Sequence, residues 1–385
     1  MLLMKKNVVI VSNTTWSIFN FRRGLIQKLI YQGHQVTAIA PPDQYVDRVK
    51  SLGCNYIPLI TLHQISKNPI RDLFLYRELK QIFRLINPDL IFLFTPKANI
   101  YGGMAAGKLN IDFISTINGL GYTFQTNSIL SFLVKRLYKV GLKKSIKVFF
   151  QNKDDKAFFI SEKIIKENKT ELVAGSGVNI SEFLPTENKE KNFTFLLCAR
   201  LLLEKGVVEY LNAAKILRKQ YPNVVFKIIG KKVKHPSAVD ETVINQYHAE
   251  GIIQYIGETD EINNELSKVH VLVNPSSYLE GVPKISLEAL SKGLPIITTN
   301  SVGCKETVNH LENGLIIPAK NSKALEEAME FMINCSKEKL LEMGKKSRLK
   351  AINQFDERLV INHYLAYLHL PLYIANEKTD IAAVS

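Results

Sequence analysis

The chain has 385 residues, 46% of them hydrophobic, and its mean hydropathy is −0.01. This length and composition predict a water-soluble protein of two globular domains. No stretch approaches the roughly 18 apolar residues that a membrane-spanning helix needs, and the start of the chain lacks a signal-peptide pattern. The four cysteines are scattered without metal-ligand spacing, which argues against a disulfide framework or a metal site and favours the reducing cytoplasm.

The net charge of +14 is concentrated in the first half of the chain. Residues 1–185 contain 25 Lys and Arg against 12 Asp and Glu, whereas residues 186–385 contain 25 against 24. A basic half beside a nearly neutral half predicts an anionic partner for the first half alone. A membrane surface or a pyrophosphate-bearing substrate fits better than nucleic acid, because no recognisable nucleic-acid-binding module accompanies the charge.

Strand-like and helix-like segments alternate along the first half. In chain order they are a strand at 8–11, a loop at 12–15, a helix running through Arg22 to Tyr31 and ending near Gly33, a strand at 36–40, a strand at 90–94 and a helix at about 99–108. Alternation of this kind predicts a parallel sheet covered by helices.

The segment 129–150 interleaves apolar and basic residues before a strand-like end at 148–150. Its basic residues are Lys135, Arg136, Lys139, Lys143, Lys144 and Lys147. Two interpretations fit this pattern. The segment can lie on an anionic membrane leaflet as a basic amphipathic helix, or it can pack its apolar stripe into the domain with its lysines in water. The glycine at 141 favours a contribution to the core.

The second half repeats the alternation after a polar linker at 186–192. Its predicted strands lie at 193–198, 224–229, 253–256, 271–274 and 296–298. We therefore expect an α/β protein of two doubly wound, Rossmann-like domains, residues 1–185 and 193–355, that face one cleft. Ligands of such sheets bind at the carboxyl ends of the strands.

The segment 275–297 carries the most informative pattern. Glu280 and Glu288 lie eight positions apart, with glycine and proline between them. Pro283 suits the first position of a helix, because its fixed φ matches a helix and its missing N–H costs nothing there. The amides of residues 284–286 would then point out of the helix start toward a diphosphate. Glu280 would reach a sugar, and Glu288 would reach back toward a ribose.

This run resembles the E-x7-E signature of the retaining glycosyltransferases of family GT4, which have the GT-B fold. The segment from Arg200 to Lys205 resembles the part of that family whose Arg and Lys bind the donor diphosphate. A departing nucleoside diphosphate gains negative charge, which two fixed cations would stabilise. The resemblance implies three catalytic residues, Arg200, Lys205 and Glu280, and a set of donor-binding residues, namely Gly257, Gly281, Lys284, Ile285 and Glu288.

One motif departs from the family pattern. Many GT4 enzymes have a His-Gly pair in the first domain, where this chain has Asn118-Gly119. Asparagine can hydrogen-bond a sugar but cannot carry a proton, and the front-face retaining mechanism attributed to the family needs no protein base there. The sequence here is similar to bacterial transferases that build lipid-linked oligosaccharides, O-antigens and capsules, including the PglA-type N-acetylgalactosaminyltransferases.

We expect the acceptor to bind the first domain through Asn13, Thr14, Arg22, Asn118 and Gly119. Arg22, expected just inside the first helix, is the candidate for the acceptor's phosphates or for lipid headgroups, because a helix start and a guanidinium both favour an anion. The GT-B resemblance also implies that a helix at 356–370 crosses back to the first domain. Residues 371–385 are mostly small or polar and are expected to form a frayed tail.

The resemblance implies a retaining glycosyltransferase that moves a sugar, such as an N-acetylhexosamine, from a UDP-sugar to a polyprenyl-diphosphate-linked saccharide. It would work without a cofactor or metal, as a peripheral protein on the inner face of the cytoplasmic membrane, in surface-glycan or glycoprotein-glycan assembly. Two alternatives share the fold. A nucleotide-sugar epimerase would need an acid and a base for adding water, and a non-catalytic sugar-nucleotide-binding subunit would lose the cations that this chain retains.

Overall fold

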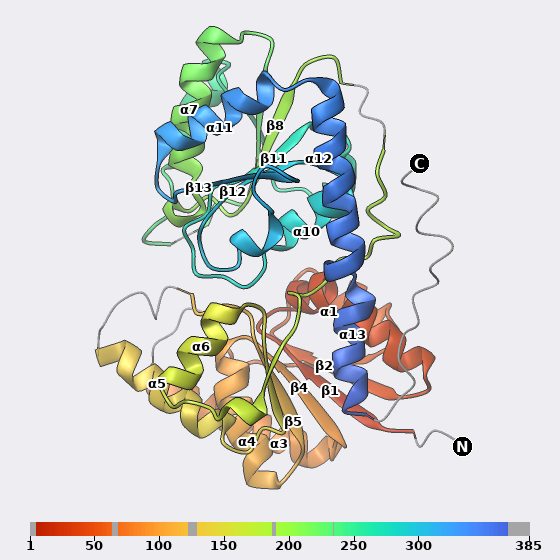
Figure 1. The fold of residues 1–385 in the computed structure, drawn as a ribbon. Coiled ribbons are helices and arrows are strands. Elements are labelled where there is room, and N and C mark those ends of the chain that lie inside the picture. The colour runs from red at the N-terminus through yellow and green to blue at the C-terminus, as the bar shows by residue number, and fades with distance from the viewer. Residues whose placement is uncertain (1–4, 64–67, 122–128, 187–189, 234, 369–385) are drawn as a thin grey trace. The chain divides into compact units, whose positions relative to one another are not determined.

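The computed structural model describes residues 5–63, 68–121, 129–186, 190–233 and 235–368 (Figure 1). The chain divides into two compact units. The first comprises the described residues up to Ser176 together with those from Arg358 onward, and the second comprises Gly177–Glu357. In these described ranges, no helix is both long enough and apolar enough to cross a lipid bilayer.

The first unit is built on a sheet of seven parallel strands in the order β3-β2-β1-β4-β5-β6-β7. The strands are β1 (Asn7–Val11), β2 (Gln35–Ala40), β3 (Asn55–Pro58), β4 (Leu90–Phe94), β5 (Phe113–Ile117), β6 (Lys147–Phe150) and β7 (Thr170–Leu172). In β1, Val8 and Ile10 belong to one buried cluster, whereas Val9 and Val11 belong to another. Successive side chains of a strand point to opposite faces, so β1 contributes to a core on each side of the sheet.

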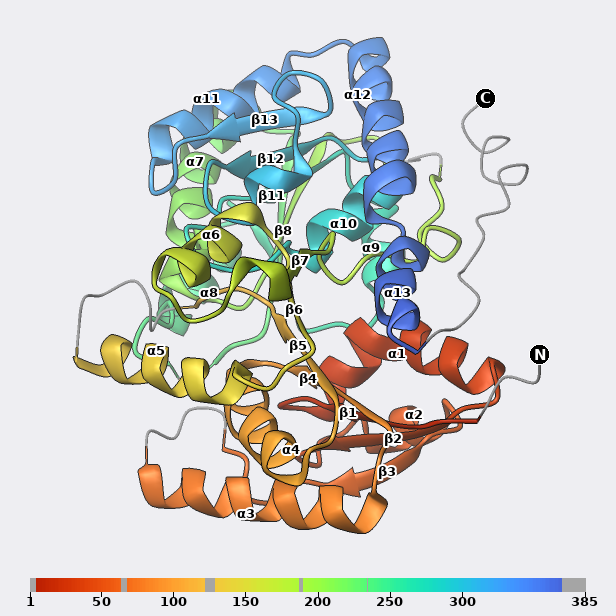
Figure 2. The same ribbon diagram turned by 60° about the horizontal axis from the view of Figure 1, so that its bottom comes forward.

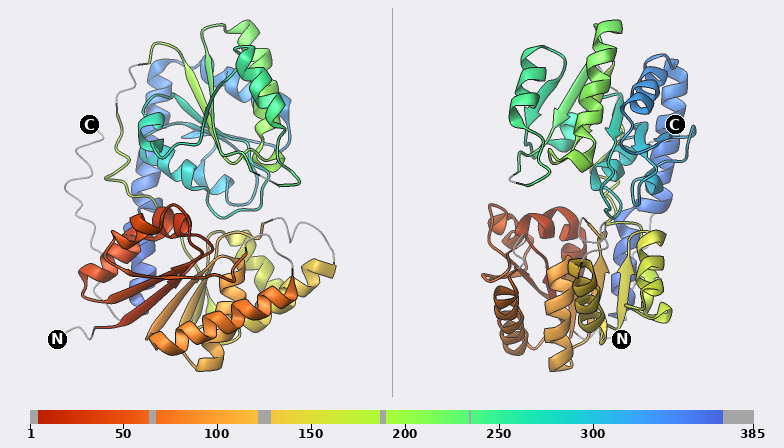
Figure 3. Two further views of the ribbon diagram at one scale, coloured as in Figure 1. Left: turned by 180° about the vertical axis from the view of Figure 1, so that it is seen from behind. Right: turned by 90° about the vertical axis from the view of Figure 1, so that its left-hand side faces the viewer.

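Helices cover both faces of this sheet (Figures 1 and 3). Apolar residues of α1 and α13 pack with Val8 and Ile10 on one face, and those of α3 and α4 pack with Val9 and Val11 on the other. Figure 2 shows α3, α4 and α5 on this second face, and α4 contacts both neighbours. The helices are α1 (Thr15–Tyr31), α2 (Val46–Lys50), α3 (Pro69–Ile86), the π-helix η1 (Ala98–Gly102), α4 (Gly103–Leu109), α5 (Ile129–Leu142), α6 (Lys153–Ser161), the 3₁₀ turn η3 (Glu167–Lys169) and α13 (Glu357–Ala366).

Helix α5 approaches η1 closely through Gly141. A Cβ atom at this position would lie 2.7 Å from the carbonyl oxygen of Ile100, so a side chain there would force the two helices apart. On the same inner side of α5, Tyr138 and Leu142 are buried. Part of the amphipathic stripe is therefore domain core.

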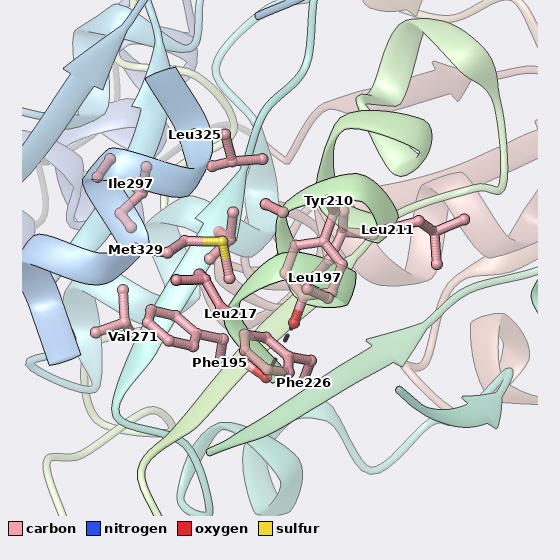
Figure 4. Packing of buried hydrophobic residues seen from close by; sticks show 14 of the residues in the cluster. Phe195, Leu197, Tyr210, Leu211, Leu217, Phe226, Val271, Ile297, Leu325 and Met329 are labelled. Atoms are coloured by element: carbon pink, nitrogen blue, oxygen red, sulfur yellow. Dashed lines mark hydrogen bonds between the residues drawn. The ribbon is translucent and has the colours of Figure 1, made fainter. Parts of the chain in front are cut away.

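The second unit has a six-stranded parallel sheet in the order β10-β9-β8-β11-β12-β13. Its strands are β8 (Thr194–Cys198), β9 (Val225–Ile229), β10 (Gln254–Gly257), β11 (Val271–Asn274), β12 (Ile296–Thr299) and β13 (Gly314–Ile317). Figure 4 shows the core on one face, where Phe195 stacks on Phe226 with ring centroids 5.8 Å apart. The hydroxyl of the fully buried Tyr210 donates to the carbonyl oxygens of Lys227, at 3.1 Å, and Phe195, at 3.3 Å, so the core buries this polar group without leaving it unsatisfied.

The helices of this unit again lie on both faces of the sheet (Figure 3). They are the 3₁₀ turn η4 (Leu203–Lys205), α7 (Val207–Gln220), α8 (Glu241–Ala249), α9 (Ile262–Leu266), α10 (Lys284–Ser291), the 3₁₀ turn η5 (Lys305–Thr307), α11 (Ser322–Ile333), α12 (Lys337–Lys350) and the π-helix η6 (Ala351–Phe355). Helices α7 and α11 pack against each other on the face that carries the aromatic core.

The predicted fold class is confirmed, because both sheets are parallel, doubly wound and Rossmann-like. One local prediction differs: the single helix expected at 99–108 is a π-helix followed by α4. In each sheet the strand order reverses at one point, between β1 and β4 and between β8 and β11. Ligands of such sheets bind outside the carboxyl ends of the strands at this reversal. The loops at the carboxyl ends of the two sheets, one loop cluster in each unit, are therefore the candidate ligand sites.

Candidate active site

The loop cluster of the second unit gathers the residues that were expected to bind the donor. Arg200 lies two residues beyond the end of β8, and the loop at 275–283 follows β11. Because β8 and β11 are neighbouring parallel strands, both segments leave the same edge of the sheet at the reversal of strand order. Lys205 ends η4, whose residue Glu204 accepts a hydrogen bond from the Ser277 amide at 2.7 Å.

Lys205 and Glu280 form an ion pair in this cluster. The Lys205 Nζ lies 2.6 Å from Glu280 Oε1, and their side chains are 11% and 19% exposed. The Ser276 hydroxyl donates to the same carboxylate oxygen at 3.0 Å. Charge-assisted hydrogen bonds of this kind hold both groups in defined positions.

Arg200 is exposed, and its guanidinium lies over the ring of Tyr278. The Arg200 Cζ lies 5.9 Å from the centroid of the Tyr278 ring, and the Lys205 Nζ lies 5.2 Å from it. Cations within about 6 Å of a ring centroid are attracted by its π face. Tyr278 stands two positions before Glu280, and no function was predicted for it from the sequence.

A second loop supports the segment that carries Glu280. A Cβ atom at Gly303, whose φ is +79°, would lie 2.0 Å from the carbonyl oxygen of Gly281 and 2.5 Å from that of Glu280. Only glycine therefore allows this backbone contact. Cys304 is fully buried beside it, and burial, with a smaller contribution from Glu280, raises the pKa of its thiol to about 12. The thiol is neutral at physiological pH and adds no charge to the site.

Helix α10 carries the second glutamate of the motif. Glu288 is 8% exposed, and its Oε1 lies 3.7 Å from the Nζ of Lys284, one helical turn earlier. Burial, and to a lesser degree Glu288, raises the pKa of the nearby Cys198 thiol to about 12. Both carboxylates of the motif are thus paired with a lysine of the same unit.

The expected geometry of the α10 start is wrong by one residue. Pro283 is the N-cap, with φ −63° and ψ 122°, and Lys284 and Ile285 are the first two helical residues. The amide of Ser286 does not point outward, because it donates to the Pro283 carbonyl oxygen at 3.1 Å. Because the ψ of Pro283 is extended, this residue lies just outside the helix. Its carbonyl oxygen accepts the hydrogen bond from Ser286 that forms the first turn.

The remaining donor candidates, Gly257 and Gly281, belong to the same unit as this cluster. Gly257 is the last residue of β10, has φ +86°, and its carbonyl oxygen accepts from the Gly230 amide at 2.8 Å. Gly281 is buried in the loop between β11 and α10. These positions belong to the same unit as the two ion pairs, on segments at the carboxyl ends of its strands.

The loop cluster of the first unit contains four of the five expected acceptor residues. Asn13 and Thr14 follow β1, and the Thr14 hydroxyl caps α1 by accepting from the Ser17 amide at 2.9 Å. Asn118 and Gly119 follow β5. All strands of the sheet are parallel, so these segments leave it at the same edge.

Asn118 has a hydrogen-bond partner, Gln151, for which no role was predicted from the sequence. The Gln151 Nε2, at the end of β6, donates to Asn118 Oδ1 at 3.3 Å. With its oxygen engaged, the Asn118 amide keeps its NH₂ group as a donor. The signal for Gln151 was its position directly after a predicted strand that pairs with β5.

Arg22 lies elsewhere in α1 than predicted. It is the eighth residue of a helix that begins at Thr15, two turns in, so the helix start does not contribute to anion binding there. Its side chain is 4% exposed, and its Cζ lies 3.8 Å above the Phe94 ring. Burial lowers the pKa of Arg22. Within the part of the chain that the structure describes, no carboxylate forms an ion pair with it.

Helix α13 packs against β4 and β5, two of the strands that lead into this cluster. The hydroxyls of Tyr364 and Thr116 lie 2.9 Å apart, and Tyr364 packs edge-on against Phe92. Burial raises the pKa of Tyr364, so the group beside Arg22 is a neutral phenol. The described residues contain no group of three or more His, Cys, Asp or Glu side chains placed to hold a metal ion.

Two family models match the chain. Residues 180–350 match the model for glycosyl transferases group 1, and residues 7–152 match the model for glycosyl transferase 4-like domains. The chain is a group 1 glycosyltransferase of family GT4. This glycosyltransferase is an enzyme of the EC 2.4 class, its two Rossmann-like units are those of the GT-B fold, and its family uses nucleotide-sugar donors. The resemblance of the E-x7-E segment to GT4 is thereby confirmed.

This glycosyltransferase is similar to curated relatives and to solved structures over most of its length. It is 29% identical over 374 residues to the N,N'-diacetylbacillosaminyl-diphospho-undecaprenol alpha-1,3-N-acetylgalactosaminyltransferase of Campylobacter jejuni, covering 92% of this chain and 96% of the relative. It is 26% identical to the capsular polysaccharide biosynthesis glycosyltransferase CapM of Staphylococcus aureus, covering 75% and 80%. The fold matches Anabaena Alr3699/HepE in complex with UDP with a TM-score of 0.76 at 15% identity, covering 94% and 99%.

Proposed function

We propose that this glycosyltransferase transfers a sugar from a UDP-sugar to a polyprenyl-diphosphate-linked saccharide with retention of anomeric configuration. An N-acetylhexosamine is the first donor sugar to test. The observation that carries the proposal is the cluster of Arg200, Lys205 and Glu280 at the reversal of strand order in the second unit. This cluster combines cations for a diphosphate with a carboxylate for a sugar.

In this proposal Arg200 and Lys205 bind the donor diphosphate and stabilise the charge that grows as UDP leaves. Glu280 accepts a hydrogen bond from a hydroxyl of the transferred sugar, and Glu288 accepts from the ribose hydroxyls. Residues 284–285 bind at the phosphates, and Gly257 and Gly281 offer backbone groups. The relative HepE, whose structure contains UDP, supports uridine as the nucleoside.

The two cations also lead us to propose that turnover needs no metal ion. Positive charge is what a divalent cation would supply to a departing diphosphate, and Arg200 and Lys205 supply it from fixed positions. Activity is therefore expected to survive EDTA. A chelator-sensitive enzyme restored by Mn²⁺ or Mg²⁺ would contradict this part of the proposal.

The acceptor is proposed to bind the first unit, with its diphosphate at Arg22. A buried guanidinium without a carboxylate partner among the described residues lacks the charge compensation that buried ions need, and an acceptor phosphate would provide it. Asn13, Thr14, Asn118 and Gly119 would contact the saccharide. The name of the Campylobacter relative, which specifies a diphospho-undecaprenol-linked acceptor and N-acetylgalactosamine transfer, supports this class of substrate.

Retention would follow a front-face course in this proposal. The acceptor hydroxyl would attack from the side on which UDP departs, and a donor phosphate oxygen would take its proton. The NH₂ group of Asn118, oriented by Gln151, would hydrogen-bond a substrate oxygen. No side chain of the proposed site has to act as a base.

We further propose that the first unit contacts the cytoplasmic membrane surface peripherally. On α5 the outward positions 129, 132, 133, 136 and 140 recur at helical spacing and form one exposed stripe, and the exposed Lys143 directly follows the helix. On α3, Ile70, Leu73 and Phe74 are 47–64% exposed. Helix α3 follows β3 and α5 follows β5, and all strands of the sheet are parallel. The exposed apolar residues at the start of each helix therefore lie at the carboxyl edge of the sheet, where the acceptor is proposed to bind.

The basic residues of α5, together with Lys143 directly after it, provide a test with a matched control. Lys135 turns inward, with its Nζ 2.9 Å from Glu162 Oε1 and 5.2 Å from the Phe158 ring, whereas Arg136, Lys139 and Lys143 are exposed. Replacing these three with glutamine should weaken binding to anionic vesicles, because each cation near the surface contributes about 1 kcal/mol. Lys135→Gln should leave vesicle binding unchanged. Equal binding by the triple variant and the parent would show that the membrane contact lies elsewhere.

Membership of a glycosyltransferase family favours transfer over the two alternatives. An epimerase would release a free epimer from a UDP-sugar in the absence of a lipid acceptor, and a binding subunit would yield no product. We would incubate the purified protein with a panel of UDP-N-acetylhexosamines and UDP-hexoses and a defined lipid-diphosphate saccharide. Mass spectrometry would identify the product, and the anomeric proton coupling in its NMR spectrum would establish retention or inversion. Inversion, or transfer only to lipid-free sugars, would refute the proposal.

A further inference from the structure

Tyr278 contacts both cations of the donor cluster with one ring. The Lys205 Nζ lies 5.2 Å from its centroid and the Arg200 Cζ lies 5.9 Å from it. The two cations lie five residues apart on the connection after β8, where the Leu202 amide donates to the Arg200 carbonyl oxygen at 2.8 Å and Lys205 ends η4. The ring of Tyr278, which belongs to the loop after β11, therefore lies near two positive charges of the connection that follows β8.

Hydrogen bonds fix the backbone that carries this ring. The Tyr278 amide donates to the Ser276 hydroxyl at 3.2 Å, and its carbonyl oxygen accepts from the Glu280 amide at 2.9 Å. The neighbouring Ser277 amide donates to the Glu204 carbonyl oxygen at 2.7 Å. The loop that carries the ring is thus hydrogen-bonded to η4, the turn that ends at Lys205.

Arg200 depends on the ring more than Lys205 does. Lys205 is also held by Glu280, whereas Arg200 is exposed and, in the part of the chain that the structure describes, pairs with no carboxylate. A long exposed side chain loses rotamer freedom when it binds a ligand. A ring that already restrains the guanidinium reduces that loss.

We infer that Tyr278 is a positioning residue that holds Arg200 and Lys205 ready for the diphosphate of the donor. The inference rests on the proposed role of these two cations in diphosphate binding. It does not depend on the nucleoside or on the acceptor. The π face of the ring, and not its hydroxyl, carries the effect, because the ring face attracts both cations.

Binding measurements on three variants test this inference. Dissociation constants for UDP and for inorganic pyrophosphate would be measured by calorimetry. Tyr278→Phe keeps the ring and should bind both ligands within about twofold of the parent. Tyr278→Leu should bind both roughly five- to thirtyfold more weakly, which corresponds to the loss of two exposed cation–π contacts. Binding of uridine, measured by competition with UDP, should be unchanged.

A matched control removes a cation–π contact elsewhere in the same unit. The Lys215 Nζ lies 5.7 Å from the Tyr247 ring on α7 and α8, and Tyr247→Leu should leave both affinities unchanged. Melting temperatures would be recorded for every variant, and Tyr278→Met would replace Tyr278→Leu if the latter is unstable.

Two results would overturn the inference: pyrophosphate binding by Tyr278→Leu as tight as by the parent, or equal weakening by Tyr278→Phe and Tyr278→Leu. A parent that binds no pyrophosphate would also overturn it. A parent that binds pyrophosphate but not UDP, with the expected ranking of variants, would support the inference while refuting uridine in the proposed function.

Discussion

Replacing Lys205 with alanine separates the structural and the chemical roles of the ion pair in the donor cluster. The pair is 2.6 Å long and largely shielded, with side chains 11% and 19% exposed. Alanine would leave the Glu280 carboxylate with the Ser276 hydroxyl, 3.0 Å away. We expect the free energy of unfolding to fall by about 1–3 kcal/mol, the cost of leaving a partly buried charged group without its partner.

Turnover should fall much further. Loss of one preorganised transition-state contact typically lowers kcat by roughly 10²–10³-fold, or about 3–4 kcal/mol. Arg200→Ala should reduce kcat on the same scale with little change in stability, because Arg200 is exposed. In the double variant Lys205→Ala/Glu280→Gln, the neutral amide should recover part of the lost stability without recovering kcat.

Urea unfolding and steady-state kinetics with saturating lipid acceptor measure the two effects on the same preparations. Lys339→Ala provides the control, since Lys339 pairs with Glu342 at 3.2 Å on an exposed face of α12. This variant should lose at most about 1 kcal/mol and keep its kcat. Recovery of turnover in the double variant, or an unchanged kcat in Lys205→Ala, would refute the assignment of Lys205 to the leaving group.

Three further results are expected. Glu288→Ala should weaken UDP binding by about 1–3 kcal/mol in calorimetry, because the buried carboxylate proposed to accept from the ribose is lost; unchanged affinity in a folded variant would exclude this contact. Arg22→Met should raise the KM for the lipid acceptor without lowering the melting temperature, because replacing an uncompensated buried charge with an apolar side chain costs little stability; an unchanged KM would exclude Arg22 from acceptor binding. Burial raises the pKa of Asp155 to about 6. The folded state therefore favours its protonated form, and the free energy of unfolding should decrease by up to about 3 kcal/mol as pH rises from about 4 to about 7. Asp155→Asn should remove this slope from urea titrations at these pH values, and an identical slope in the variant would contradict the reasoning.

The amino-acid sequence alone was sufficient for the fold class and for most strands. Parallel strands buried on both faces consist of continuous apolar runs, and the runs at 8–11, 90–94 and 271–274 lie in β1, β4 and β11. Such patterns depend only on neighbouring residues, so they can be recognised without knowledge of the rest of the chain. The E-x7-E segment was equally local, and it led to the family that the comparisons confirm.

Tertiary structure decided which side chains meet. The start of α10 differs from the prediction by one residue because the ψ of Pro283 is extended. Arg22 was expected near a helix start, yet it lies two turns into α1 and over Phe94, a residue of β4. Lys135 and Arg136 are adjacent in sequence, but Lys135 faces Glu162 and Arg136 faces solvent.

The donor cluster shows the same division most clearly. Sequence similarity named Arg200, Lys205 and Glu280 as members of one site, but it could not show that Lys205 pairs with Glu280 or that the Tyr278 ring contacts both cations. These contacts join residues 73 to 78 positions apart, and they exist because β8 and β11 are neighbours in the sheet. Composition and periodicity act over a few residues, whereas the pairing of two strands that are distant in sequence brings their loops together. The local motifs of this glycosyltransferase therefore identify its family from the sequence. The contacts within its site depend on that strand pairing, so only the tertiary structure shows them.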